Sequence, residues 1–327
     1  MATLVAPRPR VVLGEPLPGS FWVGGPLHGA GFDGVVPHIF PSVDLQFTKF
    51  MTEPTTWLPP ARWERVAFDD GLVKYRLTSW SAFADFLDAQ VFTNRGRAEH
   101  RFIWRGQRRS DWMLDSSLDR LFERLEYTGT SAKTAERRSQ EHLEDFKYAA
   151  RGRRGLNPPP LLENDWWALA QHFGLATPLL DWSHSPFAAA YFAFGEHEAG
   201  TSHRVVYGLD RDAVDLRNQR ISDEEVSEGR PRILELIDPL SDENPRLVNQ
   251  GALFTRPPIG LSVDAWVQTY FSGSEREVLL RIELPESDRA ECLRALDRMN
   301  INHLSLFPDL TGASRATNLR TELDLLS

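Results

Sequence analysis

Proline and glycine are concentrated at the start of the chain, and this limits where long elements can form. Residues 1–60 contain ten of the 22 prolines and seven of the 22 glycines. Proline removes a backbone donor and glycine loses more entropy on folding, so long helices are disfavoured there. Short aromatic runs such as Gly19–Val23 alternate with turn residues. We therefore expect strands, hairpins or an extended arm in this segment.

The composition is that of a globular protein, and it argues against several kinds of function. Hydrophobic residues make up 41% of the chain and charged residues 25%. Cys292 is the only cysteine, which excludes an intramolecular disulfide and a Cys-rich zinc site and fits a reducing cytosol. The net charge of −9 disfavours nonspecific coating of nucleic acid. Without a signal-peptide core or a run of about 18 apolar residues, we expect a cytoplasmic protein with no membrane partner.

Regular secondary structure is predicted from Arg62 onward, and the pattern changes at a boundary near residue 75. The segment Arg62–Leu77 predicts two short strands joined by an Asp-Asp-Gly turn. Helices are expected over residues 79–90, 131–151, 166–173, 187–196 and 287–299, and strands over 100–105, 203–209, 232–237 and 277–284. Asp165 and Ser185-Pro186 are helix-start signals, and Gly174 is a stop signal. We expect an N-terminal segment, residues 1–75, and an α+β domain, residues 76–327, with a central mixed or antiparallel sheet and flanking helices.

Three stretches carry the most specific motifs of the chain. The first is Phe102–Gln107 (FIWRGQ), followed by Asp111-Trp112 and Leu118-Asp119-Arg120. The second is Ala168–Ser183 (ALAQHFGLATPLLDWS), which continues through Pro186–Ala193 (PFAAAYFA). The third comprises Arg246, Asn249–Phe254 and Leu306–Gly312. In this order the stretches resemble the FRG-domain family, whose namesake is an aromatic-Arg-Gly element. Pro178 departs from the arginine that family members often carry there.

The resemblance implies a fold more firmly than a function. Some FRG proteins look distantly like ADP-ribosyltransferases of the Arg-Ser-Glu class. This implies an NAD-dependent ADP-ribosyltransferase or NAD glycohydrolase, of bacterial toxin or phage-defence type. NAD would be the substrate, and the acceptor would be a protein, a nucleic acid or water. No metal site is expected, because the chain has no His-Glu-x-x-His helix or comparable ligand cluster.

The candidate residues follow the order of that class along the chain. Arg105, with Gly106 after it, would hold the pyrophosphate through its fork of donors. Ser183 would shape the nicotinamide-ribose pocket, and Glu277 of the Glu-x-Glu motif would be the catalytic carboxylate. The further candidates for contact with NAD are Gln171, His172, Thr177, Asp181, Trp182, Arg246 and Gln250.

A structural alternative stands beside each candidate. Arg105 could be an ion-pair partner of Asp181 or Asp309. Ser183 could be a turn or capping residue, and Glu277 could face solvent at the start of its strand. The other candidates could likewise cap a helix or hold a loop together.

A rival from another class is a non-catalytic module that binds a ligand or a partner. The enzyme hypothesis requires Arg105, Ser183 and Glu277 to line one cleft within roughly 10 Å, because catalytic groups must converge on one substrate. The oligomeric state is left open by the sequence.

Overall fold

The computed structural model describes residues 61–92, 101–127, 132–155, 157–224, 232–238 and 251–325. The described residues all belong to one unit, Leu58–Ser327. The strands, hairpins or arm expected before residue 60 lie outside the described residues. The expected boundary at residue 75 lies within a strand of this unit, Leu72–Leu77.

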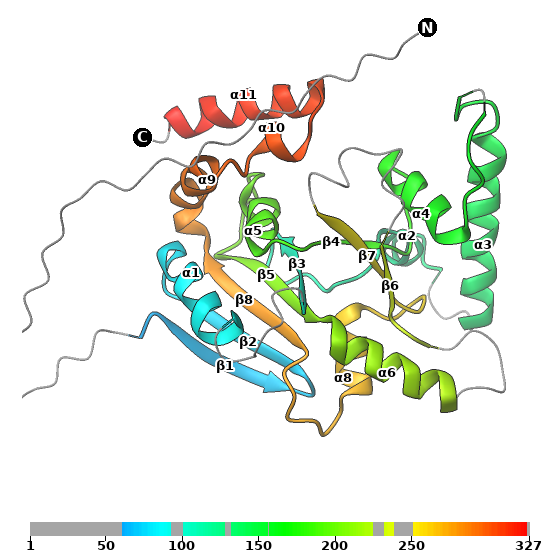
Figure 1. The fold of residues 1–327 in the computed structure, drawn as a ribbon, viewed down its shortest axis with the longest axis horizontal. Coiled ribbons are helices and arrows are strands. Elements are labelled where there is room, and N and C mark those ends of the chain that lie inside the picture. Colours follow the sequence, from blue (N-terminus) through cyan, green and yellow to red (C-terminus); the bar gives the residue numbers. More distant parts are fainter. Residues whose placement is uncertain are drawn as a thin grey trace, which may run out of the picture. The chain divides into compact units, whose positions relative to one another are not determined.

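The described part of this unit contains a mixed sheet of eight strands in the order β1-β2-β8-β5-β3-β4-β7-β6 (Figure 1). The strands are β1 (Trp63–Asp69), β2 (Leu72–Leu77), β3 (Phe102–Gln107), β4 (Leu180–Ser183), β5 (His203–Asp210), β6 (Glu235–Ile237), β7 (Ala252–Arg256) and β8 (Leu279–Pro285). β2 and β8 are parallel, and the other paired neighbours are antiparallel. The predicted α+β class with a central sheet is therefore confirmed, and the sheet is mixed.

Helices flank this sheet. They are α1 (Phe83–Phe86), α2 (Ser117–Arg124), α3 (Ala132–Ala149), α4 (Glu163–His172), α5 (Pro186–Phe194), α6 (Arg211–Glu224), α8 (Val263–Tyr270), α9 (Arg289–Arg298), α10 (His303–Leu306) and α11 (Leu310–Leu325). A 3-10 turn, Trp80–Ala82, precedes α1, and a π-helical turn, Leu87–Phe92, follows it. A further 3-10 turn, Glu286–Asp288, leads into α9.

Helix ends follow the local signals of the sequence with one difference. The Ser185 hydroxyl accepts a hydrogen bond of 3.2 Å from the Ala188 amide at the start of α5. Gly174 has a φ of +88° just after α4, as a glycine stop signal predicts. Asp165 is not the N-cap of α4, because the helix already begins at Glu163. Its carboxylate instead accepts a hydrogen bond of 3.2 Å from the Leu162 amide.

The predicted pair of strands around the Asp-Asp-Gly turn is confirmed as the hairpin β1–β2. Asp70 and Gly71 have φ values of +42° and +87°, which the tight turn between twisted strands requires. β2 then pairs with β8, so that Tyr75 lies opposite Ile282. The hairpin therefore extends the central sheet.

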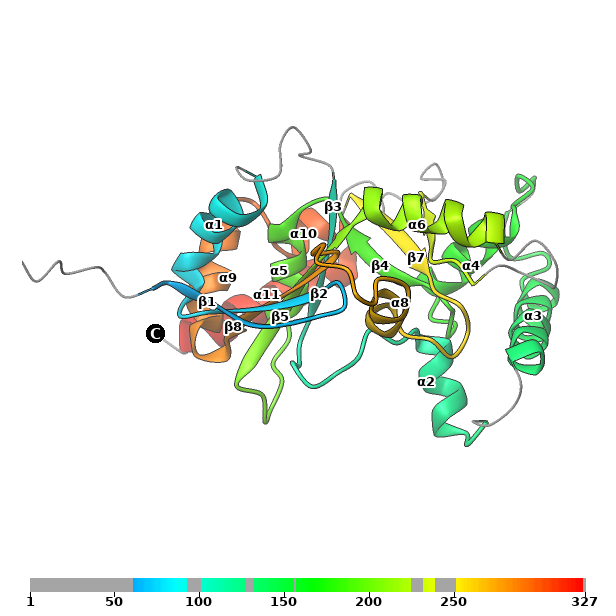
Figure 2. The ribbon, with the colours of Figure 1, turned by 90° about the horizontal axis from the view of Figure 1, so that it is seen from below.

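The strands alternate between two packed faces, as a pleated sheet covered on both sides requires. In β3, Phe102 and Trp104 belong to a core shared with α1, α5 and α9. Ile103 belongs to the core on the opposite face, shared with α6 and α8. The helices α2, α3 and α4 form a third core with β6 and β7 at the other end of the sheet (Figure 2).

Candidate functional site

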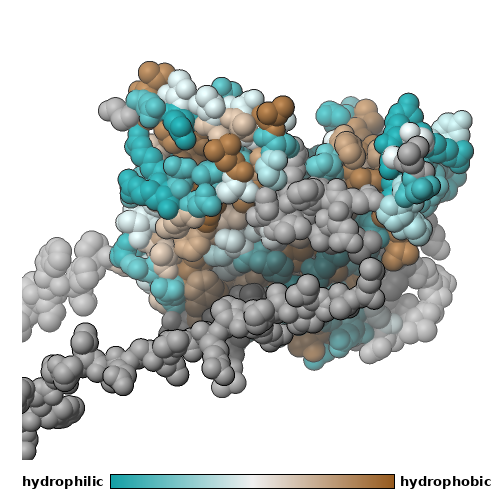
Figure 3. All heavy atoms as spheres, turned by 45° about the horizontal axis from the view of Figure 1, so that its top comes forward, coloured by the Kyte–Doolittle hydropathy of each residue, from teal (hydrophilic) through white to brown (hydrophobic). Residues whose placement is uncertain are grey.

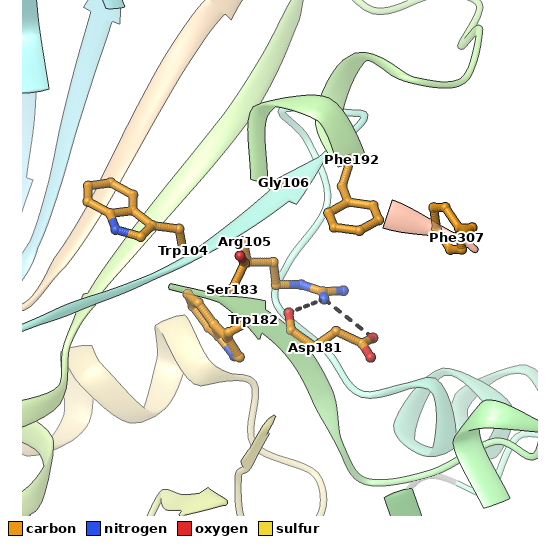
Figure 4. A pocket seen from close by; sticks show the side chains of 8 residues that line it. All are labelled: Trp104, Arg105, Gly106, Asp181, Trp182, Ser183, Phe192 and Phe307. Carbon is orange, nitrogen blue, oxygen red and sulfur yellow. Dashed lines mark hydrogen bonds and ion pairs between the residues drawn. The ribbon is translucent and has the colours of Figure 1, made fainter. Parts of the chain in front are cut away.

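A pocket of about 320 Å³ opens where β3 and β4 separate. β3 pairs with β5 from Phe102 to Gln107 but meets β4 only where Trp104 lies opposite Ser183. β4 is held from its other side by β7. The pocket is lined by Trp104, Arg105, Gly106, Asp181, Trp182, Ser183, Phe192 and Phe307 (Figure 4). The motifs of β3 and β4 therefore meet at one site.

Arg105 lies between the diverging strands and carries an incompletely compensated charge. Its Nη1 donates a hydrogen bond of 2.7 Å to the main-chain oxygen of Asp181, which is a neutral acceptor. The Asp181 carboxylate is farther away, at 3.9 Å from Nη1. The Nε atom of Arg105 is buried and has no hydrogen-bond partner among the described residues. Burial lowers the pKa of this guanidinium, and Asp181 offsets the effect only in part. Since arginine stays protonated, the site favours an added anion.

A hydrogen-bond relay orients Asp181 beside this arginine. The Thr177 hydroxyl donates to the side-chain oxygen of Gln171, and the Gln171 amide nitrogen donates to Asp181 Oδ1 over 2.7 Å. Thr177 is fully buried, and its amide in turn donates to the Ser117 hydroxyl of α2 over 2.8 Å. The Asp181 side chain remains 63% exposed. The relay therefore presents a solvent-accessible carboxylate in a fixed direction.

Two phenylalanines form the apolar wall of the pocket. Phe192 comes from α5 and Phe307 follows α10, and their ring centroids lie 6.0 Å apart at an interplanar angle of 86°. Both side chains are half-buried. The rings stand to one side of the Arg105 guanidinium, whereas the rings of Trp104 and Trp182 point away from it (Figure 4). The wall is therefore suited to a flat or apolar group beside an anion.

Gly106 is required by the packing of α5 against β3. A Cβ atom at this position would lie 1.9 Å from the main-chain oxygen of Ala189 and 2.5 Å from the amide nitrogen of Ala193. No side chain fits such a distance. Gly106 lines the pocket, but its missing side chain makes room for a helix, and this close packing places Phe192 near Arg105.

The side chains of the adjacent residues Trp182 and Ser183 lie on opposite faces of β4. The Ser183 side chain is buried, and its hydroxyl accepts a hydrogen bond of 3.0 Å from the Ser185 amide, which is the turn role weighed as its alternative. The Trp182 ring lies on the opposite face of β4 and donates to the Thr255 hydroxyl over 2.9 Å. Trp182 therefore contributes backbone to the pocket and its ring to the core.

Glu277 does not line this pocket. Its carboxylate is 17% exposed, accepts a hydrogen bond of 3.0 Å from the Tyr75 hydroxyl, and lies 3.4 Å from Arg65. The residue of β8 in register with Arg105, through Tyr207 of β5, is Arg281. Glu277 precedes Arg281 by four residues, or about 13 Å of extended chain, and it lies before β8, a strand two positions away from β3. The structure thus brings Arg105 and Ser183 together without Glu277.

The remaining predicted residues are dispersed. His172 is exposed at the end of α4, where its ring packs edge-on against Phe173. Asp309, weighed as an ion-pair partner of Arg105, accepts a hydrogen bond of 2.8 Å from the Gly312 amide. Arg246 and Gln250 lie outside the described residues.

Phe192 and Phe307 were not predicted as site residues. Both lie within the motif stretches Pro186–Ala193 and Leu306–Gly312, so the only signal for them was membership of those motifs. Among the described residues, no group of three or more His, Cys, Asp or Glu side chains is placed to hold a metal ion. None of the described helices is long and apolar enough to cross a membrane.

Comparison with known families gives a match to part of the chain. Residues 100–202, which contain the aromatic-Arg-Gly strand and the Gln-His-Phe-Gly…Leu-Asp-Trp-Ser segment, match the family model of the FRG domain. This segment of the chain is therefore similar to FRG domains. Searches of curated proteins and of solved structures returned no match.

Proposed function

We propose that the FRG domain of this protein is a binding module for a small anionic ligand that carries a flat ring, such as a nucleotide. The observation that carries this proposal is the Arg105 guanidinium beside the Phe192–Phe307 wall: its side chain is 22% exposed, its hydrogen bond goes to a neutral main-chain oxygen, and the Asp181 carboxylate is 3.9 Å away. A phosphate or carboxylate at Arg105 compensates a desolvated cation, and charge-assisted hydrogen bonds are the strongest of their kind. The phenylalanines pack against the ring.

The volume of the pocket limits how much of a ligand it can enclose. About 320 Å³ is at the lower end of the range for small-molecule sites. Such a pocket encloses one ring and one charged group more readily than a whole dinucleotide. A larger ligand would extend from the pocket past the exposed Asp181 carboxylate.

A second candidate is NAD-dependent ADP-ribosyl transfer or NAD hydrolysis. The position of Asp181 favours it, because the pocket already has a relay-oriented, accessible carboxylate next to Arg105 and Ser183. Arg105 would hold the pyrophosphate, and Asp181, in place of Glu277, would stabilise the cation formed as the nicotinamide bond breaks. The acceptor, protein, nucleic acid or water, and the toxin or phage-defence setting in the cytoplasm remain predictions.

The binding function is tested by calorimetric titration of the purified chain with AMP, ADP-ribose and adenosine. We expect AMP and ADP-ribose to bind at least about tenfold more tightly than adenosine, and Arg105→Ala to abolish the difference. Arg108→Ala is the matched control, because Arg108 is a surface residue paired with Glu196. Equal affinity for adenosine and AMP, or unchanged affinity in Arg105→Ala, would contradict the proposal.

The two candidates are separated by nicotinamide release from NAD. Release that is lost in Asp181→Asn and retained in Glu277→Gln would favour transferase chemistry at this pocket. Binding of ADP-ribose without release, in the presence of candidate protein and nucleic-acid acceptors, would favour the binding module.

A further inference from the structure

A second pocket, of about 350 Å³, lies between α9, α10 and α11. It is lined by Tyr191, Leu293, Arg294, Asp297, Asn302, His303, Leu304, Ala316, Leu319, Arg320, Leu323 and Asp324. Its inner side is formed by Tyr191 of α5 and His303 of α10, whereas the first pocket is lined by the neighbouring Phe192 and by Phe307. The two pockets are therefore separate but share the α5–α10 contact as a wall.

A buried tyrosine–histidine pair forms the base of this pocket. The Tyr191 hydroxyl is hydrogen-bonded to His303 Nδ1, and the two side chains are 2% and 6% exposed. Burial raises the pKa of Tyr191, so the phenol stays protonated and donates a hydrogen bond to His303 Nδ1. Burial also lowers the pKa of His303, which keeps the imidazole neutral. A neutral imidazole that accepts at Nδ1 carries its proton at Nε2.

This Nε2–H group is available to a ligand. The hydrogen bond to Tyr191 is the single hydrogen bond of the His303 side chain within the described residues. Among the described residues Nε2 has no hydrogen-bond partner, and it is not completely shielded from solvent. Because His303 is otherwise buried and lines the pocket, we infer that Nε2 faces that pocket.

Some charged groups at the rim of this pocket have hydrogen-bond partners, and one has none within the described part of the chain. Asp297 accepts a hydrogen bond of 2.9 Å from the Asn302 amide, and Asp324 has a partner of its own. Arg294 donates to the main-chain oxygen of Leu323 over 2.8 Å. Arg320 has no hydrogen bond or ion pair with any described residue. His303 Nε2 and the Arg320 guanidinium are the lining donors without a partner among the described residues, so together they can bind an acceptor or an anion, although the Asp297 and Asp324 carboxylates also line the pocket.

The walls between these donors are aliphatic. Leu293, Leu319, Leu323 and Ala316 line the pocket from α9 and α11. The face over α9, α10 and α11, at the upper left of Figure 3, carries hydrophobic side chains among hydrophilic ones. Apolar walls with a few convergent polar groups are the usual composition of a small-molecule site.

We propose that the α9–α11 pocket binds a small amphipathic carboxylate, with its aliphatic chain between the leucines and its carboxylate between His303 Nε2 and Arg320. The leucine walls exclude water from the chain, and the two donors satisfy the two carboxylate oxygens. This site does not depend on the function proposed for the Arg105 pocket.

The test uses calorimetric titration of the full chain with octanoate, 1-octanol and octylammonium, which share one tail and differ in the head group. We expect octanoate to bind at least about tenfold more tightly than either of the others. Arg320→Ala should weaken octanoate binding roughly threefold to tenfold, and His303→Phe about tenfold, because each removes one donor. Arg298→Ala is the matched control, since Arg298 is exposed at the end of α9 and does not line the pocket.

His303→Phe leaves the Tyr191 hydroxyl without its partner, so its folding is checked by thermal denaturation. Arg320→Ala changes an exposed side chain and remains informative if His303→Phe does not fold. Equal binding of octanoate and 1-octanol, or octanoate binding unchanged in Arg320→Ala, would overturn the proposal. Octanoate binding that is retained in Arg105→Ala supports it, and loss in that variant would place the ligand in the first pocket instead.

Discussion

The Arg105 guanidinium donates to the main-chain carbonyl of Asp181 across the gap where β3 and β4 separate. A charged side chain thus connects two strands at the point where their backbone ladder ends. The acceptor is neutral, so the bond holds the strands together without neutralising the arginine. An anionic ligand would neutralise the positive charge of Arg105 that the carbonyl leaves uncompensated.

Arg105→Met removes this desolvated cation and retains an apolar side chain. We expect the free energy of unfolding to change by no more than about 1 kcal/mol, because burying the charge has its own cost. Affinity for ADP-ribose should fall at least about tenfold. Urea denaturation and calorimetry measure the two effects, with Arg108→Met as the control. A large loss of unfolding free energy with unchanged affinity for ADP-ribose would show that Arg105 only connects the two strands.

Gly106→Ala should destabilise the domain by about 3 kcal/mol or more, because the new Cβ meets the α5 backbone and the helix must move. The control is Gly174→Ala, where no atom lies within 4 Å and the cost is about 1 kcal/mol for a φ of +88°. Thermal denaturation of both variants is the measurement. Equal losses would show that α5 can shift away from β3 at little cost.

Thr177→Val tests the relay that orients Asp181. The variant keeps the buried shape but leaves the Gln171 side-chain oxygen without its donor, at a cost of about 1–2 kcal/mol. We also expect a severalfold loss of affinity for ADP-ribose, since Asp181 is no longer held in place. Ser139→Ala is the control, because the buried Ser139 hydroxyl has no hydrogen-bond partner among the described residues. Unchanged affinity for ADP-ribose would show that the relay does not contribute to binding.

Glu277→Gln should leave ADP-ribose affinity within about twofold of the parent, because the residue lies outside the pocket and distant sites act independently. Its hydrogen bond to Tyr75 can be retained by the amide, so the loss of stability is expected to be about 1 kcal/mol or less. Calorimetry and denaturation check both values. Loss of NAD turnover at unchanged stability would restore Glu277 as the catalytic carboxylate.

Glu283 predicts a pH dependence of stability. Burial by itself raises the pKa of a carboxyl, but Lys74, Arg281 and Arg76 around Glu283 hold its pKa below the ordinary value. A carboxyl with a lowered folded pKa stabilises the fold above its unfolded pKa of about 4.3, and the effect is lost as the pH falls through the folded pKa.

Glu283→Gln should therefore cost about 3 kcal/mol at neutral pH, where three cations lose their buried partner. The difference from the parent should shrink below about pH 4. Urea denaturation at several pH values measures it, and Glu64→Gln, whose side chain is 64% exposed, is the control. A difference that stays constant down to acid pH would mean that the lost stability comes from packing.

The motifs of the sequence predicted which residues of β3 and β4 meet, but not the whole wall of the pocket. Arg105, Gly106, Asp181 and Ser183 are brought together because β3 and β4 are neighbours in the sheet, with Trp104 opposite Ser183. The strand at Leu180–Ser183 itself was not predicted, since four residues are too few to reveal alternation. Phe192 resembled an ordinary core residue of a helix.

The error of position for Glu277 has a topological cause. A Glu-x-Glu before a strand shows where a strand begins, and β8 does begin two residues later, at Leu279. Which neighbours that strand has is decided by long-range pairing. β5 stands between β8 and β3, and β2 lies on the other side of β8. Local sequence carries no information on this order, so the distance from Arg105 could not be predicted.

The rings at the α5–α10 contact connect the two pockets. Tyr191 and His303 lie 5.3 Å apart, His303 stacks on Phe307 at 5.2 Å, and Phe307 meets Phe192 at 6.0 Å. A ligand that shifted His303 in one pocket would disturb the packing of the Phe307 ring in the other. Coupling free energy between two sites is reciprocal, so each ligand would change the Kd of the other by the same factor. An amphipathic carboxylate bound beside α10 would then change the affinity of the Arg105 pocket for its anion.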